Sequence, residues 1–542
     1  MVNLVFFISF LVTVVIISKI YGAASAFRTK KKLGTLWGLL PENQLDIESA
    51  RLLFTLKEKK LSEQSYIIDN NTWTDLDMDA FFKTLDRSVT PIGAQCLYTT
   101  LRQPLLSQNE LHEREKLISA FSNNKLLREK LQIVLAPLSK HYVKYLVYSL
   151  YTPLPPKSKY AFIFYSLSAI ALWLLIFSIS GLVNWGFVVL MFVFNSIIVF
   201  VYRKRLNQFL STFQYLAVLI KAADKTSNLL KKDMPEINSE LEACLKNTRS
   251  IFYNIFSLQQ SEENPIAAYT NIYLLSQITG FYSALNKIKL NIESLKKLFE
   301  TIGYLDAMIS VASYRKQFPN FCHPVFNTTT HRFEMTEIFH PLLKNPVSNN
   351  FDFESRNTLI TGSNMSGKST FLKTIGINAV IAQSLNMSTS QKYDVPFLRI
   401  ISAIERSENL LTGKSYYMSE VESILRIIKA SQTKDVYLFI VDEIFRGTNS
   451  IERTAASIEV LKYLANEKDF VILATHDLQL TTVLQNSYKN FHFREEMTET
   501  GLHFDYELHT GTATSKNAIA LLEYVGYPKS IVEGARKSAE NS

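Results

Sequence analysis

The sequence predicts a helical, membrane-attached first part followed by a C-terminal α/β domain of the P-loop NTPase class with a largely parallel sheet. Three observations predict this fold class. Uncharged apolar runs interrupt the first 202 residues, amphipathic helical patterns fill the rest of the chain up to residue 332, and short β-branched runs alternate with helical patterns only after Phe333. Because 47% of the 542 residues are hydrophobic, the chain can bury more than one core.

The first apolar run, residues 2–17, has no charged residue; Lys19 is the first charge after it, and further basic residues follow from Arg28 onward. Its length is close to the roughly 20 residues that span a bilayer. A cleaved secretory signal is the alternative, since residues 23–26 offer a cleavage site; a signal, however, carries its positive charge before the apolar run. The sequence therefore predicts an N-terminal transmembrane anchor at 1–27, with the N-terminus outside and the following residues in the cytoplasm.

A pair of apolar runs, residues 160–179 and 185–201, is separated by a short loop. Basic residues stand before and after the pair, and the loop has none. This charge distribution predicts a transmembrane hairpin at 159–202 with both ends in the cytoplasm. A buried hairpin of a soluble protein is the alternative, although uncharged stretches of this length are rare in soluble cores. We therefore expect a multi-pass protein of a bilayer such as the bacterial inner membrane, with a cytoplasmic C-terminal domain.

The cysteines and the net charge give little information about the function of the protein. Cys96, Cys244 and Cys322 are far apart and show no paired spacing, so the sequence predicts neither a disulfide framework nor a zinc site. The formal net charge is +9, but part of it comes from lysines and arginines beside the apolar runs, which contact anionic headgroups. The charge alone therefore does not indicate nucleic-acid binding.

A phosphate-binding loop is predicted directly after a strand at residues 357–361, where the sequence matches G-x-x-x-x-G-K-[ST]. In such a loop backbone N–H groups wrap the phosphates of ATP, glycines permit close approach, and the following helix, 371–385, directs its positive dipole end at the anion. Lys368 is expected to reach the β- and γ-phosphates and to act in catalysis, and Ser369 to bind Mg²⁺. The predicted nucleotide-binding residues of the loop are Gly362, Ser363, Asn364, Met365, Ser366, Gly367, Lys368, Ser369 and Thr370.

Two further strands end in polar residues. An apolar strand at 436–441 is followed by Asp442, placed to hold Mg²⁺, and Glu443, the candidate general base for an attacking water. The alternative is that this acidic pair merely ends a strand. A third strand, 470–474, leads to His476, which could sense the γ-phosphate or orient the water, although a lone histidine is more often structural.

These motifs resemble those of the MutS mismatch-repair family. The resemblance covers the loop at 361–370, the segment Asp-Glu-Ile-Phe-Arg-Gly-Thr at 442–448, and Ala-Thr-His at 474–476. Residues 413–420 are similar to the family's signature segment, which reaches into the nucleotide site of a partner subunit. The resemblance therefore implies a homodimer with composite ATP sites, in which Ser415 contacts the γ-phosphate across the interface.

A less specific likeness extends over the rest of the chain. Residues 85–93 and 101–104 resemble the start of the MutS core domain, and 302–306 resembles the end of its lever helices; adenine is expected near Val347. Residues 514–516 and 526–532 resemble the closing helical region. The predicted division is an anchor at 1–27, a first helical core part at 28–158, the hairpin at 159–202, a second lever and core part at 203–332, and a MutS-type ATPase domain at 333–542.

Departures from the family pattern bear on function. The chain before Leu76 is too short for the mismatch-reading and connector domains, and the hairpin interrupts the region that would surround DNA. The sequence therefore predicts a membrane-anchored ATPase that hydrolyses ATP in a dimer and transmits the nucleotide state through helical levers, with DNA as an unproven partner and no small-molecule substrate other than ATP. The alternatives are a membrane-tethered DNA clamp of the mismatch-repair or recombination type and, third, a component of an ATP-driven transporter.

Overall fold

The computed structural model describes the chain between Lys31 and Glu540, apart from residues 32–33, 42–44, 141–143, 154–160, 264, 319, 328–331, 354–356, 364, 405–415, 446–448, 466–467, 499–500 and 513–521. The predicted anchor at 1–27 lies outside the described residues, as do Asn364, Ser415 and residues 514–516. The chain divides into two compact units. The first comprises Met1–Lys60, Asp86–Thr99 and Leu117–Tyr314, and the second Leu61–Leu85, Thr100–Lys116 and Arg315–Ser542.

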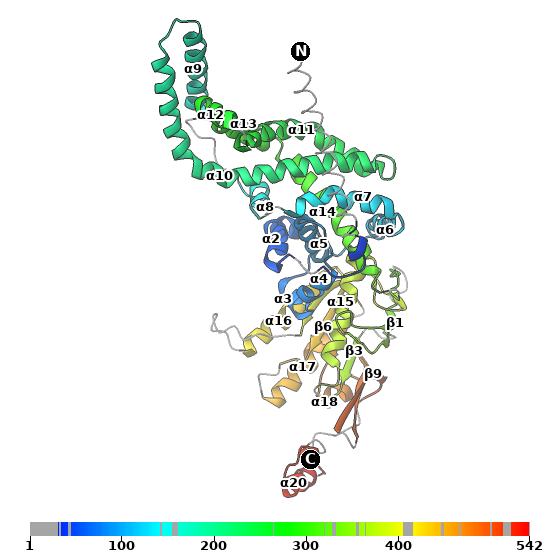
Figure 1. The fold of residues 1–542 in the computed structure, drawn as a ribbon. Coiled ribbons are helices and arrows are strands. Elements are labelled where there is room, and N and C mark those ends of the chain that lie inside the picture. Colours follow the sequence, from blue (N-terminus) through cyan, green and yellow to red (C-terminus); the bar gives the residue numbers. More distant parts are fainter. Residues whose placement is uncertain are drawn as a thin grey trace. The chain divides into compact units, whose positions relative to one another are not determined.

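The described part of the first unit is helical (Figure 1), as the sequence predicts for this region. The division between the units falls within α2 (Ile47–Gln64), α5 (Pro91–Arg102) and α6 (Gln108–Asn123), and the last residue of α14 also belongs to the second unit. The others are α7 (Lys125–Leu135), η1 (Ala136–Lys140), α8 (Lys144–Tyr151), α9 (Ala161–Ile179), α10 (Trp185–Leu230), α11 (Pro235–Glu263), α12 (Pro265–Leu274), α13 (Ser276–Leu290) and α14 (Ile292–Arg315).

Helices α5 and α14 are joined around a buried carboxylate. Asp306 of α14 accepts hydrogen bonds from the backbone N–H of Val89 (3.1 Å), the backbone N–H of Thr90 (2.8 Å) and the Thr90 hydroxyl (2.7 Å). Close approach of the helices requires glycine, since a Cβ at Gly303 would lie 2.4 Å from the Cys96 sulfur. Burial raises the pKa of Asp306 to about 6, because the interior disfavours the charged carboxylate.

Replacing Asp306 with alanine is expected to destabilise the first unit by about 3 kcal/mol or more, because three donors would be left buried without an acceptor. Thermal unfolding of the detergent-purified protein, followed by circular dichroism, measures the change. The control is Glu293→Ala, which removes only an exposed pair with Lys296 and should change stability by less than about 0.5 kcal/mol. Equal melting temperatures for the two variants would show that other contacts hold α5 against α14.

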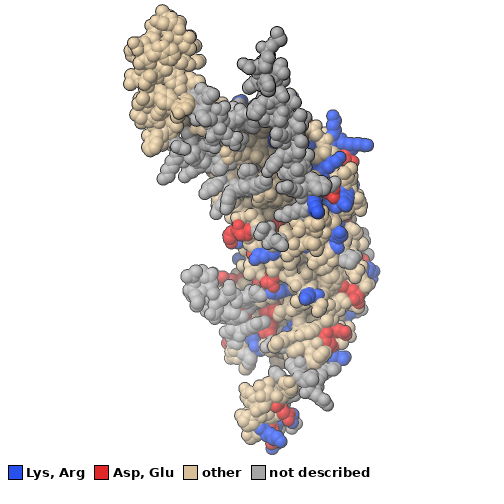
Figure 2. Space-filling view, in the orientation of Figure 1, with Lys and Arg blue, Asp and Glu red and all other residues tan. Residues whose placement is uncertain are grey.

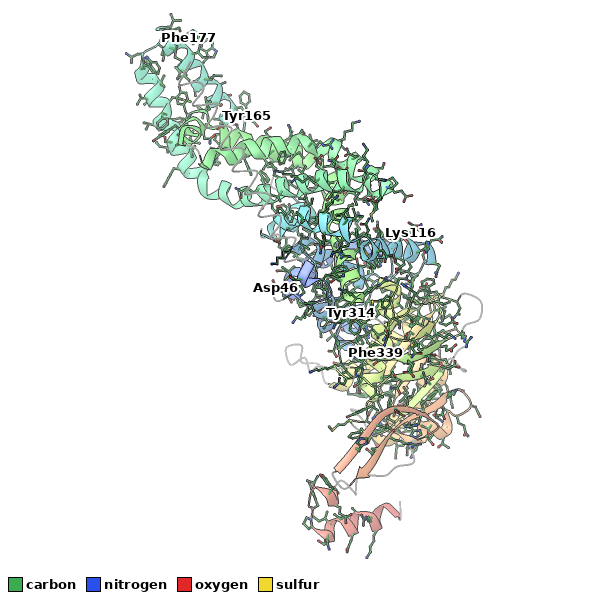
Figure 3. All side chains as sticks on the ribbon, turned by 45° about the vertical axis from the view of Figure 1, so that its right-hand side comes forward. Asp46, Lys116, Tyr165, Phe177, Tyr314 and Phe339 are labelled. Carbon is green, nitrogen blue, oxygen red and sulfur yellow. The ribbon has the colours of Figure 1, made fainter. Side chains whose placement is uncertain are left out.

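The apolar hairpin of the first unit consists of α9 and the first 18 residues of α10, Trp185–Tyr202. Their mean hydropathies are 2.3 and 2.2, and only 17% and 11% of the residues are buried within the protein. No charged side chain is visible on the hairpin face in Figure 2, and Figure 3 shows Phe177 near its tip and Tyr165 nearer its base. Within the described residues these are the two helices long and apolar enough to cross a membrane. The third predicted span, the anchor at 1–27, lies outside the described residues.

The second unit is built on a six-stranded sheet (Figure 1). The strands are parallel except for the last pair, which is antiparallel. The sheet is therefore largely parallel, as the sequence predicts, with an antiparallel strand at one edge. Its order is β5 (Arg399–Ala403), β6 (Tyr437–Asp442), β7 (Phe470–Ala474), β3 (Asn357–Thr361), β8 (Lys489–Thr498) and β9 (Gly501–Thr510). A smaller antiparallel sheet has the order β2 (Asn349–Asp352), β1 (Glu334–Ile338) and β4 (Lys392–Asp394).

Helices complete the second unit, and some come from early in the chain. They are α3 (Asn70–Asp75), α4 (Met78–Leu85), α15 (Lys368–Leu385), α16 (Tyr416–Ser431), α17 (Ser450–Leu464), α18 (Leu478–Val483) and α20 (Lys529–Glu540). Asp75 of α3 accepts hydrogen bonds from the Ser402 hydroxyl (2.7 Å) and the Ile404 N–H (3.0 Å), at the end of β5. The sheet therefore shares its unit with residues that the sequence division assigns to the preceding helical region.

Candidate nucleotide-binding site

The candidate phosphate loop lies between buried strand β3 and helix α15. Gly362 and Gly367 have φ angles of +147° and +107°, which side chains disfavour. A Cβ would lie 2.8 Å from the Ser366 hydroxyl at Gly362, and 3.2 Å from the Tyr506 ring at Gly367. The two glycines of the sequence motif are thus required by the backbone of the loop.

Lys368 begins α15 and turns back over the loop. Its ammonium donates hydrogen bonds to the carbonyl oxygens of Gly362 (2.7 Å) and Ser363 (2.6 Å), and its side chain is buried. This places a positive charge between the loop and the N-terminus of α15, where helix N–H groups also favour an anion.

Ser369 and Asp442 meet although 73 residues separate them in sequence. Ser369 lies in the first turn of α15, and its hydroxyl donates a hydrogen bond to the carboxylate of Asp442 at the end of β6. A hydroxyl and a carboxylate are both oxygen ligands of the kind that Mg²⁺ prefers. The donor set therefore fits the metal ion that the sequence predicts here.

Glu443 and His476 form a second pair at the same edge of the sheet. His476 Nδ1 lies 2.7 Å from Glu443 Oε1, within hydrogen-bond distance. Glu443 is buried and has a φ of +59°, an uncommon conformation for a side-chain-bearing residue that is often found at functional sites. Its N–H donates to the carbonyl of Ala474 (2.9 Å), which ties the ends of β6 and β7 together.

A cavity of about 480 Å³ is lined by several of the residues described above. Predicted residues among its lining are Val347, Met365, Gly367, Lys368, Ser369, Thr370, Asp442 and Glu443. Gly362, Ser363, Ser366 and His476 are not lining residues: the Ser363 hydroxyl hydrogen-bonds Glu495, and the half-exposed His476 side chain contacts Glu443 without lining the cavity. Asn364 and Ser415 lie outside the described residues.

The other walls of the cavity come from residues that the sequence analysis did not single out as site residues. They are Ile338, His340, Leu343, Asn345, Asn349, Phe371, Thr374, Phe493 and Tyr506. Burial lowers the pKa of His340 to about 4, so its imidazole is neutral at pH 7. Phe371 and Thr374 follow the loop on α15, but no short motif could have identified the others, because they come from β1, β2, β8, β9 and the segment after β1, far from the loop in sequence.

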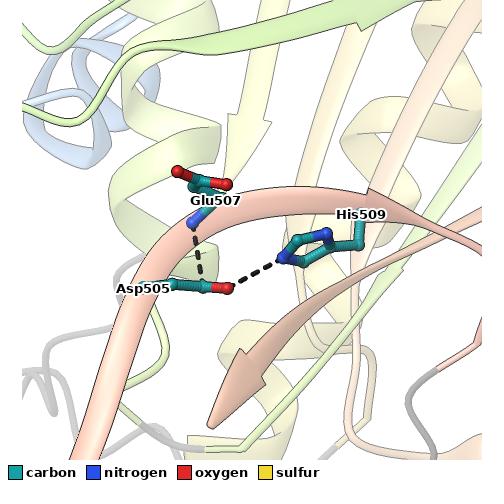
Figure 4. A group of neighbouring side chains, drawn as sticks. All are labelled: Asp505, Glu507 and His509. Carbon is teal, nitrogen blue, oxygen red and sulfur yellow. Dashed lines mark hydrogen bonds and ion pairs between the residues drawn. The ribbon is translucent and has the colours of Figure 1, made fainter.

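The position of Tyr506 depends on a bend in β9. Its φ of +56° interrupts the extended strand, and Asn349 holds the bend by donating to the Tyr506 carbonyl (3.1 Å) and accepting from the Leu508 N–H (2.6 Å). Beside the bend, Asp505 accepts from the Glu507 N–H (3.0 Å) and pairs with the imidazole of His509 (2.8 Å), as Figure 4 shows. These contacts give the three polar residues a structural role in placing the Tyr506 ring at the cavity.

Comparison with known proteins identifies the family. Residues 358–541 match MutS domain V, and residues 67–312 match MutS domain III. The chain belongs to the MutS family. The resemblance inferred from the motifs is thereby confirmed, and the loop, Asp442, Glu443 and His476 all fall within the segment matched to MutS domain V.

Relatives of this chain match it over part of their length. The DNA mismatch repair protein MutS of Thermus thermophilus is 31% identical over 201 residues, which are 36% of this chain and 24% of the relative. That of Natronomonas pharaonis is 27% identical over 265 residues, 47% and 30% of the two chains. That of Fervidobacterium nodosum is 26% identical over 295 residues, 53% and 35%. The chain thus covers about a quarter to a third of the length of these curated relatives.

Proposed function

We propose that this MutS-family chain binds ATP with Mg²⁺ in the cavity beside α15 and hydrolyses it. The observation that carries the proposal is the contact of Ser369 with Asp442, next to the ammonium of Lys368. A hydroxyl, a carboxylate and a lysine around the N-terminus of a helix form an arrangement suited to a triphosphate and its metal ion. The test is ATP turnover by the detergent-purified full chain; absence of both binding and turnover would overturn the proposal.

Binding of the phosphates would use the loop and Lys368. The loop supplies backbone N–H groups, and α15 contributes the positive end of its dipole. The Lys368 ammonium would exchange the carbonyls of Gly362 and Ser363 for phosphate oxygens, which are stronger acceptors. Ser369 and Asp442 would hold Mg²⁺, which neutralises charge on the β- and γ-phosphates when bound.

Hydrolysis requires a group that positions and deprotonates water. Glu443 lines the cavity beside Asp442 and can accept that proton on its carboxylate. His476, within hydrogen-bond distance of Oε1, would act as a positioning residue that fixes the orientation of the carboxylate.

The adenine would be held by the apolar lining of the cavity. Leu343, Val347, Phe493 and Tyr506 offer aliphatic and aromatic surfaces, and aromatic rings stack well on a planar base. A composite site, with Ser415 of a second subunit at the γ-phosphate, is proposed from the family resemblance. The nucleotide state would then pass through helical levers to the rest of the chain.

A membrane location is proposed for the hairpin of α9 and α10, with the ATP site on the cytoplasmic side. Its support is the exposure of two helices with mean hydropathies of 2.3 and 2.2, which would leave a large apolar surface in water. Labelling by a phospholipid with a photoreactive acyl chain tests this location. A hairpin that takes up no label would contradict it.

Action on DNA is the second candidate function. The observation that favours it is membership of a family whose listed relatives carry the name DNA mismatch repair protein. If the chain clamps DNA, its affinity for duplex DNA should fall steeply with salt, because contacts to several phosphates release counterions. Weak binding that is insensitive to salt would count against a DNA clamp and leave the ATPase proposal untouched.

A further inference from the structure

A charge-free stretch lies in the helical tract that follows the hairpin. Residues 264–286 contain no aspartate, glutamate, lysine or arginine. They form α12, with 10 residues, and most of α13, with 15 residues, so neither helix is long enough to cross a bilayer alone. An uncharged stretch of this kind can enter an apolar layer only if its backbone groups find partners there.

Tyr273 of α12 is anchored in the hairpin. Its ring joins an apolar cluster with Ala171 of α9 and Met191 of α10. Its hydroxyl donates a hydrogen bond to the Ala171 carbonyl (2.9 Å). Ala171 is near the middle of the 19-residue helix, about 15 Å along its axis from the first residue and about 12 Å from the last, so α12 meets the hairpin well inside its apolar span.

Asn195 of α10 supports the end of α12. The helix is interrupted at Leu275, whose φ is +48°, and an interruption leaves carbonyl groups of the preceding turn in need of outside donors. The fully buried Asn195 amide donates to the Tyr273 carbonyl (2.6 Å). Water would satisfy such a carbonyl in a solvated helix break, whereas in hydrocarbon a protein group must do so. A buried amide that bonds this carbonyl within an uncharged hairpin therefore fits a break inside a membrane.

The contacts continue into α13, and Tyr269 of α12 is exposed. The Tyr165 hydroxyl donates to the Thr279 carbonyl (3.0 Å), and the rings of Phe164 and Tyr282 stack with centroids 6.0 Å apart. Figure 1 shows α12 beside α9 and α10. Tyr269 of α12 has 65% of its surface exposed, and its ring centroid lies 6.3 Å from that of Phe192 of α10.

We propose that α12 and the first turns of α13 enter the membrane beside the hairpin, with lipid acyl chains against the outward side of α12. This proposal rests on the membrane location proposed for α9 and α10. The occupant is lipid, because the exposed Tyr269 ring lies beside Phe192 on the apolar hairpin, and the Tyr273 carbonyl at the helix break is bonded by Asn195 of the hairpin.

The test uses the full chain in phospholipid vesicles that contain a phospholipid with a diazirine in its acyl chain. After irradiation, labelled peptides are mapped by mass spectrometry. We expect label in residues 161–202 and in 265–282, and none in α14. A labelled hairpin with an unlabelled α12 would overturn this inference and leave the hairpin proposal standing, whereas an unlabelled hairpin would defeat both. Cross-linking of α12 to a second copy in place of lipid would also overturn it.

A pair of neighbouring variants tests the role of Asn195. Asn195→Leu removes the donor to Tyr273 and should lower labelling of α12 about fivefold relative to labelling of the hairpin, the effect of losing one buried hydrogen bond. Ser196→Leu is the control, since the Ser196 hydroxyl bonds only its own helix at Phe192 (2.7 Å) among the described contacts, and it should leave the ratio unchanged. An unchanged ratio in both variants would contradict the proposed role of Asn195.

Discussion

Glu443→Gln is expected to bind ATP and Mg²⁺ but to hydrolyse ATP at least about 100-fold more slowly than the wild type, the usual loss when a general base is removed. The amide preserves the size of the side chain and a hydrogen-bonding group for His476, so the site should stay intact. It cannot take a proton from water at neutral pH. Single-turnover release of phosphate measures the chemical step separately from binding.

The control for this variant is Glu459→Gln. Glu459 is exposed and pairs only with Lys462 in the described structure, so its replacement should leave hydrolysis unchanged. Glu443→Gln with a wild-type rate would remove Glu443 from the proposed role. Loss of ATP binding together with hydrolysis would instead show that the carboxylate is needed to form the site, and the base would have to be sought elsewhere.

Lys368→Ala is expected to weaken ATP binding by roughly 100-fold, because the site would lose charge-assisted hydrogen bonds to the phosphates. Equilibrium titration with a fluorescent ATP analogue measures the affinity. Lys373→Ala is the matched control: it lies on the same helix, pairs with Asp77 at 2.7 Å and does not line the cavity. Its affinity should equal that of the wild type.

Folding must be checked separately for the lysine variant. Lys368 also bonds the carbonyls of Gly362 and Ser363, so its loss could loosen the loop. A melting temperature within a few degrees of the wild type would assign the lost affinity to the missing charge. Equal ATP affinities for Lys368→Ala and Lys373→Ala would contradict a phosphate-binding role for Lys368.

The sequence predicted the elements whose residues lie close together along the chain. The glycine pattern at 362–367 is local, so it identified the loop, and the uncharged runs identified the hairpin. Asp442 and Glu443 could be predicted because parallel strands place their carboxyl ends at one edge of a sheet. The contact of Ser369 with Asp442 is the consequence of that rule.

Long-range pairings explain what the sequence could not predict. Nothing in the pattern around Asp75 indicates that it would meet Ser402 and Ile404, so the membership of α3 in the sheet unit was not foreseen. The same holds for Tyr506, whose place in the cavity depends on a bend held by Asn349.

The segment at α12 was missed for a different reason. Thr270 and Asn271 interrupt its apolar character, and it is too short to register as a span. Its relation to the hairpin becomes visible only through the hydrogen bonds of Asn195 and Tyr273. The sequence of α12 alone does not indicate a membrane segment, whereas its contacts with the hairpin do.

Magnesium-dependent ATP binding by the purified full chain tests the central claim, that Lys368, Ser369 and Asp442 together form a site for ATP and its metal ion. The measurement is equilibrium titration of the wild type and of Asp442→Asn with ATP, with Mg²⁺ and after its removal by EDTA. We predict saturable binding by the wild type that is tightened by Mg²⁺, and loss of most of that tightening in Asp442→Asn. A wild-type protein that binds no ATP, or that binds it equally well without Mg²⁺, would contradict the claim.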